Sequence, residues 1–257
     1  MRAEQFRALH QPGRPLLIAN PWDAGSARLL AAIGFQALAT SSSGFAGTLG
    51  RLDYGVTREE AIAHAAAVVA AVDVPVSADL EDCFGDPAGT VRMAVDAGLA
   101  GCSIEDWDGE RLLPIDEAAA RVAEAVGAAD GELLITARAE TFTRGRPDVA
   151  ETIARLQAYE VAGADVLFAP LADRAEVLRE LVTVVGRPVN VLARAGVSPV
   201  AELAELGVAR ISVGSGFAFA ALGAAADVAR ELLEHGTYGF ADAAARGAAV
   251  ARPAFGS

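Results

Sequence analysis

Short apolar segments rich in β-branched residues alternate with Ala-rich, helix-length segments along the whole chain. This alternation is typical of repeated βα units, whose parallel strands are covered on both faces. Eight strands are expected, at 16–20, 37–42, 75–82, 101–106, 133–140, 165–170, 188–193 and 210–215. The expected helices begin near Ala24, Thr57, Pro87, Ile115, Pro147, Arg174, Ser198 and Phe217. Eight units in 257 residues predict a single-domain (β/α)8 TIM barrel over residues 1–257.

The glycines help to separate this architecture from its rival, an open doubly wound sheet. Gly98, Gly163 and Gly207 each fall between a helix and the next strand, where a left-handed cap is expected. An open sheet would carry a Gly-rich phosphate turn after its first strand, whereas this chain reads Asn-Pro-Trp-Asp at 20–23. The Gly-rich turn at 213–216 instead follows the eighth strand, where barrels often hold phosphate. A phosphate-binding barrel of another family therefore stays open.

Charge and hydropathy exclude several classes of function. With 21 Lys and Arg against 34 Asp and Glu, the net charge of −13 opposes nucleic-acid binding. The apolar runs are interrupted before the roughly 18 residues that a membrane-spanning helix needs, so no membrane association is expected. The amino terminus lacks the pattern of a secretory signal, and the chain has only two cysteines. A cytoplasmic protein is the resulting expectation.

Acidic residues follow several expected strands at the end where barrel enzymes carry their functional groups. Alternation along the third strand would send Asp79 and Glu81 to one side, with Glu105 at the corresponding level of the fourth. Three carboxylates facing one cavity repel each other unless a hard cation binds between them. The sequence therefore predicts a Mg2+ site, with Mn2+ as an alternative ion. Asp82 and Asp106 are expected to point away and to pair with surrounding groups.

The histidines and cysteines of the chain fall outside the expected acidic site. His10, His64 and His235 lie outside the strand ends, so neither a zinc site nor a histidine proton relay is expected. Cys102 lies within an apolar strand and should fill the core. Cys83 follows the acidic motif directly, and a packing role is expected for it as well.

Six motifs occur in the order and spacing of one known superfamily. They are Asn20-Pro21-Trp22-Asp23-Ala24-Gly25-Ser26-Ala27, Thr40-Ser41-Ser42-Ser43-Gly44, Leu49-Gly50-x-x-Asp53, Asp79-x-Glu81-Asp82, Ile104-Glu105-Asp106 and Ala137-Arg138-x-Glu140-x-Phe142. On these motifs the chain resembles the isocitrate lyase and phosphoenolpyruvate mutase superfamily from about Asn20 to Ser215. The resemblance implies a barrel that binds Mg2+ and a small 2-oxo acid and reacts through an enolate.

The resemblance also implies roles for individual residues. Asp79 would bind the metal directly, while Glu81 and Glu105 would hold metal-bound waters. The two expected catalytic residues are Arg138, whose planar guanidinium suits a carboxylate or oxyanion, and Asp53, near the reacting end. The expected substrate-binding residues are Trp22, Asp23, Ser43, Gly44, Phe45, Arg138 and Asn190.

Two departures from the superfamily pattern leave the reaction open. The lyases carry a Lys-Lys-Cys-Gly-His segment after strand four, where this chain reads Trp-Asp-Gly-Glu-Arg-Leu-Leu-Pro at 107–114. Many short relatives read Ala-Arg-Thr-Asp-x-Phe on strand five, where this chain has Ala139 and Glu140 at the third and fourth positions. Cysteine-based cleavage of isocitrate or methylisocitrate is therefore not expected.

Three functions consequently remain. The first is a Mg2+-dependent decarboxylase, hydrolase or lyase that cleaves the carbon–carbon bond beside the oxo group of a small 2-oxo acid or di-acid. The second is a phosphonopyruvate or carboxyphosphonate mutase or hydrolase, and the third is a barrel that binds a metabolite without turnover. The apolar segment from Phe217 to Leu233, together with the resemblance, predicts a homo-oligomer, a dimer or tetramer that uses the carboxyl-terminal helix.

Overall fold

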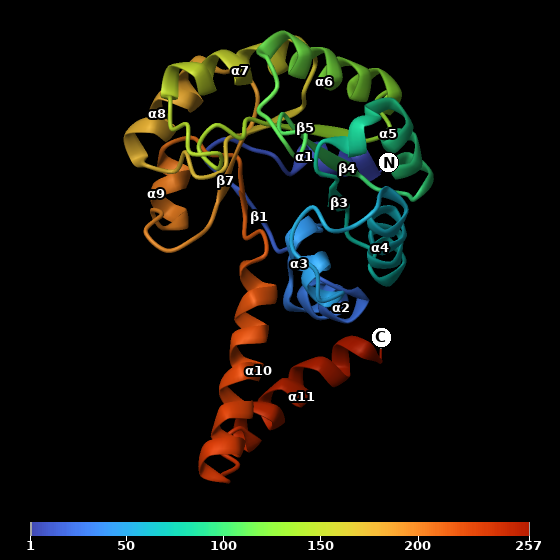
Figure 1. Cartoon of the computed structure of the whole chain (residues 1–257), viewed down its shortest axis with the longest axis vertical. Coiled ribbons are helices and arrows are strands. Elements are labelled where there is room, and N and C mark those ends of the chain that lie inside the picture. Colours follow the sequence, from blue (N-terminus) through green and yellow to red (C-terminus); the bar gives the residue numbers. More distant parts are fainter. Residues whose placement is uncertain (1, 257) are drawn as a thin grey trace.

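Eight parallel strands in the described part of the chain form one sheet, in the order β1-β8-β7-β6-β5-β4-β3-β2. The structure is a computed structural model that describes residues 2–256, so positions 1 and 257 of the expected domain lie outside it. A bridge between Ala19 and Leu38 joins the two ends of the strand order. The sheet thus closes into the predicted single-domain (β/α)8 barrel (Figure 1). The strands are β1 (Leu16–Ile18), β2 (Leu38–Ala39), β3 (Val76–Asp79), β4 (Gly101–Glu105), β5 (Leu134–Arg138), β6 (Val166–Phe168), β7 (Val189–Leu192) and β8 (Arg210–Ser212).

The helices that surround the barrel begin within two residues of the expected positions. The side chains of Asp23, Thr57, Asp86 and Asp148 each accept a hydrogen bond from a first-turn amide, which explains why four of these helices begin where they do. The surrounding helices are α2 (Ala24–Ile33), α4 (Arg58–Ala71), α5 (Pro87–Asp96), α6 (Ile115–Ala129), α7 (Val149–Val161), α8 (Ala175–Val184) and α9 (Val200–Glu205).

The predicted glycine caps are confirmed, and they set the helix-to-strand turns. Gly98, Gly163 and Gly207 have φ values of 77°, 101° and 89°, in the left-handed region that favours glycine. Each turn returns the chain to the amino-terminal end of the barrel, so that each following strand runs toward the same mouth.

Four elements were not predicted from the sequence, of which three adjoin the barrel and the fourth, α11 (Ala241–Phe255), lies near the carboxyl terminus. Helix α1 (Arg2–Ala8) buries Phe6 completely against Leu16, Ile18 and Leu134 and closes the amino-terminal end of the barrel. Helix α3 (Ser42–Thr48) begins where the second strand was expected to end, and a short 3-10 helix, η1 (Cys83–Gly85), follows β3. The strands are themselves shorter than expected.

The main hydrophobic core lies between the strands and the surrounding helices. Cys83 and Cys102 are both fully buried in this core, which agrees with the packing roles expected for them. A buried thiol in apolar surroundings is inert, because burial raises the pKa of both cysteines and keeps them protonated.

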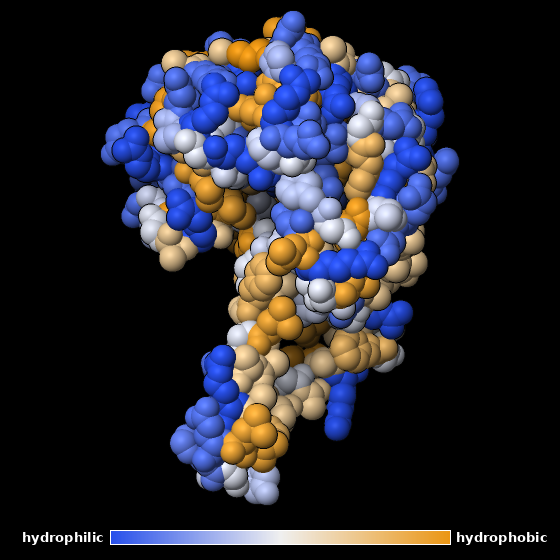
Figure 2. Space-filling model, in the orientation of Figure 1, coloured by the Kyte–Doolittle hydropathy of each residue, from blue (hydrophilic) through white to orange (hydrophobic). Residues whose placement is uncertain are grey.

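The carboxyl-terminal helices form an arm that leaves the barrel. Helix α10 (Gly216–His235) extends away from the strands, and α11 (Ala241–Phe255) turns back toward α2 (Figure 1). Apolar side chains are exposed along this arm, among them Phe219, Leu222 and Leu233 (Figure 2). Although α10 is long, none of the described helices is apolar enough over a sufficient length to cross a bilayer. The cytoplasmic location stays a prediction.

Candidate active site

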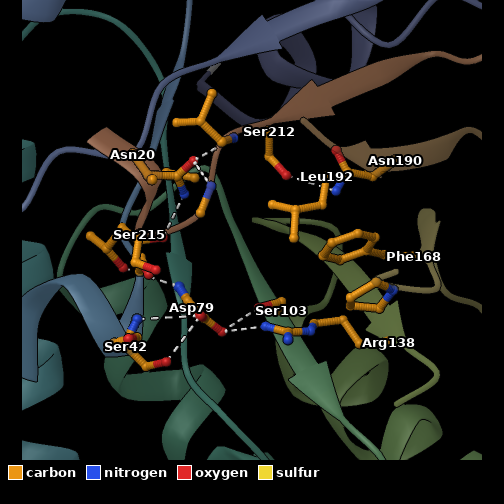
Figure 3. A pocket seen from close by; sticks show the side chains of 18 of the residues that line it. Asn20, Ser42, Asp79, Ser103, Arg138, Phe168, Asn190, Leu192, Ser212 and Ser215 are labelled. Atoms are coloured by element: carbon orange, nitrogen blue, oxygen red, sulfur yellow. Dashed lines mark hydrogen bonds and ion pairs between the residues drawn. The ribbon is translucent and has the colours of Figure 1, made fainter. Parts of the chain in front are cut away.

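A polar cavity of about 800 Å3 opens at the carboxyl ends of the strands. Side chains from all eight strands or the loops that follow them line it (Figure 3). Six residues expected at the site lie on its wall: Ser43, Asp53, Asp79, Glu105, Arg138 and Asn190. Asn190 contributes from β7 on the opposite side. The barrel therefore brings together the acidic residues and the arginine that the sequence singled out.

Asp79 lies at the centre of the hydrogen-bond network in this cavity. The Ser42 backbone N–H and hydroxyl each donate to Oδ2 at 3.2 Å, and the Ser103 hydroxyl donates to Oδ1 at 3.0 Å. Thr40 fixes the backbone of this residue, since its hydroxyl accepts from the Asp79 N–H at 3.1 Å. Three neighbouring elements, the loop into α3, β3 and β4, thus hold the carboxylate in one orientation (Figure 3).

Arg138 on β5 connects three carboxylates. Its Nη1 lies 2.9 Å from Asp79 Oδ1 and 2.9 Å from Glu105 Oε1, and its Nε donates to Glu140 Oε1 at 2.8 Å. Among the described residues, Nη2 of Arg138 has no hydrogen-bond acceptor. Burial disfavours the charged form of Arg138, but the charges of Glu105, Glu140 and Asp79 together outweigh it and raise its pKa well above the usual range. The guanidinium is therefore held rigidly while one of its nitrogens remains to bind a ligand oxygen.

Glu105 is almost fully buried. Two residues at the cavity mouth that were not predicted from the sequence lie beside it. The Tyr54 hydroxyl donates to Glu105 Oε2 at 2.5 Å, and Arg144 Nη2 donates in turn to the Tyr54 hydroxyl. The Arg144 guanidinium lies 4.2 Å from the centroid of the Trp107 ring, a cation–π contact. Trp107 belongs to the loop after β4, so this cluster covers the side of the cavity next to that loop.

The position of Glu81 corrects the expectation that Asp79 and Glu81 face one cavity by strand alternation. Strand β3 ends at Asp79, and Glu81 adopts a φ of 52°, so the side-chain alternation breaks after the strand. Glu81 lies in a small recess beside the cavity, lined also by Asp79, Phe45 and His64. It is 4% exposed, and its Oε1 has no hydrogen-bond partner among the described residues.

The charge state of Glu81 reflects this position. Burial, followed by the charges of Asp79, Asp53 and Asp82, raises its pKa to about 8. Among the described residues, no three acidic, histidine or cysteine side chains converge closely enough to hold an ion unaided. The donor set still fits a hard cation that keeps several waters, because Asp79 presents oxygens to the cavity and Glu81 has one without a donor.

Asp53 lies at the cavity wall as expected. It accepts a hydrogen bond of 2.8 Å from the Ser42 hydroxyl, the same hydroxyl that lies 3.2 Å from Asp79. Desolvation of its carboxyl group raises the pKa of Asp53, the Ser42 hydroxyl lowers it, and the charge of Asp79 raises it further. The Ser42 hydroxyl thus lies between the carboxylates of Asp53 and Asp79.

Four of the expected substrate-binding residues lie outside the main cavity. Asp23 caps α2, where its Oδ1 accepts from the Ser26 N–H at 2.6 Å, and Trp22 directly precedes it. Gly44 is buried in the first turn of α3, and Phe45 stacks on His64 with ring centroids 4.0 Å apart. These four do not line the main cavity, and their part in substrate binding stays a prediction.

The Gly-rich turn after β8 is already occupied by a side chain. Asn20 Oδ1 accepts from the Val213 N–H at 3.1 Å and from the Gly214 N–H at 2.9 Å (Figure 3). Two of the amides that a phosphate would need are therefore bonded within the protein. This contact disfavours the phosphate-binding barrel left open by the sequence.

The two acidic residues expected to point away do so. Asp82 pairs with Arg121 at 3.0 Å. Asp106 is buried in a network outside the barrel, where Arg155 Nη1 lies 2.9 Å and the Tyr159 hydroxyl 2.6 Å from its Oδ2. These pairs satisfy both carboxylates, so neither belongs to the site.

The histidines also fall where the sequence placed them, away from the cavity. His10 is buried beneath the barrel, His64 packs on Phe45 behind α3, and His235 is exposed at the end of α10. The described structure therefore offers no histidine for proton transfer in the main cavity.

Comparison with known proteins identifies the family to which this site belongs. The family model described as phosphoenolpyruvate phosphomutase matches residues 6–233. The fold, the acidic cluster and this match place the chain among the lyases and mutases of the phosphoenolpyruvate mutase and isocitrate lyase superfamily. The chain belongs to the phosphoenolpyruvate phosphomutase family. The prediction of an enzyme of this superfamily is thereby confirmed.

Individual relatives differ in what is known of them. An uncharacterised protein of Mycobacterium tuberculosis is 39% identical over 88% of this chain and 87% of its own length. Carboxyvinyl-carboxyphosphonate phosphorylmutase of Arabidopsis thaliana is 30% identical over 91% of this chain and 75% of its own. A solved candidate lyase/mutase of Burkholderia cenocepacia is 47% identical, with a TM-score of 0.90 over 94% of this chain and 91% of that one.

A more distant solved structure shares the fold alone. This structure, of phosphonopyruvate hydrolase with oxalate and Mg2+, is 23% identical, with a TM-score of 0.84 over 95% of this chain and 91% of that one. Because the relatives include both lyases and a phosphorylmutase, family membership leaves the reaction open.

Proposed function

We propose that this protein is a Mg2+-dependent enzyme that cleaves the carbon–carbon bond beside the oxo group of a small 2-oxo acid through an enolate. The observation that carries the proposal is the convergence of Asp79, Glu105 and Arg138 at one cavity, with Arg138 Nη1 2.9 Å from both carboxylates. Opposite charges held this close are preorganised for a substrate that is itself an anion and that gains charge during reaction.

Three acidic residues would hold the metal. Asp79 would supply the direct ligand, since its carboxylate is oriented by Ser42 and Ser103. Glu81 and Glu105 would bind metal-held waters, consistent with the donor-free oxygen of Glu81. When bound, Mg2+ supplies a Lewis acid that stabilises negative charge on the substrate oxygens. The same proposal allows Mn2+, which accepts similar oxygen ligands.

The side chains around the metal residues have distinct tasks. Arg138 would bind the carboxylate or the developing oxyanion through Nη2, the nitrogen without an acceptor among the described residues. Ser43 would add a hydroxyl and a backbone amide at the cavity wall, with Asn190 opposite. Asp53, whose pKa is raised, would hold or take up a proton near the reacting bond.

A phosphonate reaction is the second candidate, because the Arabidopsis relative is a carboxyphosphonate phosphorylmutase. The experiment that tests both is a turnover screen of oxaloacetate, substituted malates and phosphonopyruvate with Mg2+, followed by pyruvate or oxalate detection. Cleavage of a carbon substrate that stops in chelator supports the first function. Turnover of phosphonopyruvate alone would replace it with the second, and turnover of none would favour a metabolite-binding barrel.

We also propose that a second copy of the chain covers the carboxyl-terminal arm. Leu17 faces outward from β1 and is 42% exposed, because α10 leaves the barrel instead of covering this strand. Leu233 on α10 is 85% exposed, and Phe219 and Leu222 are about half exposed. Such apolar surface indicates an interface. Leu222→Glu with Leu233→Glu should convert a dimer or tetramer to monomer by light scattering, whereas a monomeric wild type contradicts the proposal.

A further inference from the structure

The cavity has two chemically different halves. The β2–β5 side holds the acidic residues and Arg138, whereas the β6–β8 side is lined by Phe168, Leu192, Asn190 and Ser212 and by two arginines, Arg194 and Arg210. A volume of about 800 Å3 far exceeds that of a three-carbon acid. The second half therefore has room for part of a substrate that the proposed chemistry does not use.

Arg210 is held in one orientation inside the barrel. It is 6% exposed, its Nε donates to Asn190 Oδ1 at 2.9 Å, and its Nη1 donates to Thr136 Oγ1 at 3.1 Å. Its Nη2 has no acceptor in the hydrogen bonds of the described residues. Both partners are neutral, so these contacts orient the guanidinium without compensating its charge.

The lack of a counter-ion among the described residues distinguishes Arg210 from the other three arginines at the cavity. Arg138 contacts Asp79, Arg144 lies 3.9 Å from Glu105, and Arg194 lies 2.6 Å from Asp173. In the part of the chain that the structure describes, no salt bridge involves Arg210. A buried charge without a counter-ion destabilises a fold, so its presence needs a compensating benefit.

The charge persists at neutral pH. Burial, and after it the neighbouring charge of Arg138, lowers the pKa of Arg210 to about 9. The side chain is therefore a cation at pH 7, with one nitrogen unused and an open cavity beside it. An anionic group is the partner that such a guanidinium lacks.

We infer that Arg210 is a specificity-determining residue that binds a second anionic group of the substrate, so the substrate is a 2-oxo acid with a further carboxylate or equivalent anion. This inference rests on the proposed function for the position of the first carboxylate. Thr136, which contacts Arg210, precedes Arg138 by two residues on β5, roughly 6.6 Å along a strand. An acid with its second anion a few bonds from the oxo group spans that separation.

The test compares three probes by calorimetry with Mg2+: oxalate, 2-oxobutyrate and 2-oxoglutarate. Oxalate occupies only the position of the first carboxylate. Of the two oxo acids, 2-oxoglutarate carries a second carboxylate and 2-oxobutyrate does not. The wild type should bind 2-oxoglutarate about 10- to 100-fold more tightly than 2-oxobutyrate, the effect of one charge-assisted hydrogen-bonded contact. Arg210→Met should abolish that preference and change the oxalate affinity less than about threefold. Arg187→Met, at an exposed arginine, is the matched control and should change neither.

Stability separates a binding role from a structural one. Because Arg210→Met removes an uncompensated buried charge, its melting temperature should equal or exceed that of the wild type. A large fall in melting temperature with the preference intact would assign Arg210 a packing role and overturn the inference. Arg210→Lys, which keeps the charge but not the planar guanidinium, should retain only part of the preference and supplies the comparison if the methionine variant does not fold.

The outcomes also separate this inference from the proposed function. A wild type that binds no oxalate with Mg2+ contradicts the proposed function. A wild type that binds oxalate but prefers 2-oxobutyrate, or binds both oxo acids equally, overturns the assignment of Arg210 alone.

Discussion

Removal of Asp79 should abolish the effect of Mg2+ and oxalate on stability while leaving the fold intact. Oxalate resembles the planar enolate of pyruvate, so a site built for that enolate should bind it through the metal and Arg138. At about 100 times its dissociation constant, oxalate should add roughly 2.7 kcal/mol to the apparent free energy of unfolding of the wild type. For a domain of this size that corresponds to about 5–10 °C in melting temperature. In Asp79→Ala the shift should disappear.

The cost of Asp79→Ala to the unliganded protein should be small. The variant removes the acceptor of the Ser42 N–H and of the Ser103 hydroxyl, but Arg138 keeps Glu105 and Glu140 as partners. Repulsion between Asp79 and Glu81, the second cause of the raised pKa of Glu81, also disappears. These opposing effects should leave the free energy of unfolding within about 2 kcal/mol of the wild type.

Scanning fluorimetry with Mg2+, with chelator and with oxalate measures these quantities. Asp148→Ala is the matched control: Asp148 caps α7 outside the cavity, so its loss should cost about 1 kcal/mol and preserve the oxalate shift. A Mg2+-dependent shift that survives in Asp79→Ala would refute the metal assignment. An equal shift of the wild type in chelator would refute the role of the metal in oxalate binding.

Three further substitutions test the surroundings of the site. Arg155→Met should destabilise the protein by about 3–5 kcal/mol in urea unfolding, because it leaves the Asp106 charge buried without its cation, and a loss below 1 kcal/mol contradicts this. Burial lowers the pKa of His10 to about 3, so the folded state disfavours its protonation and loses stability as pH falls below 6.5. In His10→Gln the loss between pH 6.5 and 4.5 should be smaller by roughly 2–3 kcal/mol, and an unchanged pH profile would show that His10 is not the cause. Tyr54→Phe removes the donor to Glu105 and should weaken Mg2+ about tenfold in titrations of the oxalate shift; unaltered Mg2+ affinity would leave Tyr54 without a part in metal binding.

The strands and helices could be predicted from the sequence, because their side-chain patterns repeat with a period that backbone geometry fixes. The strands and surrounding helices follow apolar runs, caps and glycines, which act locally. The outward direction of Asp106 is an example: it follows Glu105, the last residue of β4, and adjacent strand residues point to opposite faces. Glu81 could not be placed in the same way, because alternation ends with β3 and a left-handed backbone reorients its side chain.

Contacts between distant loops were beyond such reasoning. Tyr54 adjoins the expected Asp53, yet its proximity to Glu105 and Arg144 depends on how three loops meet at the cavity mouth. The cation–π contact of Arg144 with Trp107 arises only when the loops after β4 and β5 fold toward each other. The direction of α10 was equally hidden, because its apolar pattern suits a helix against the barrel as well as one in an interface.

A fully satisfied network outside the barrel supports the charged groups inside it. Asp106 Oδ1 accepts from the Glu140 N–H at 2.8 Å, and its Oδ2 accepts from Arg155 and Tyr159 on α7. This ties the end of β4 to the end of β5 directly behind Glu105 and Arg138. Inside the barrel Arg138 pairs with Glu105 at 2.9 Å, while burial and the charges of Glu140 and Asp79 raise the pKa of Glu105. Rigid support from the Asp106 network therefore holds these side chains at the separation that keeps the pair intact.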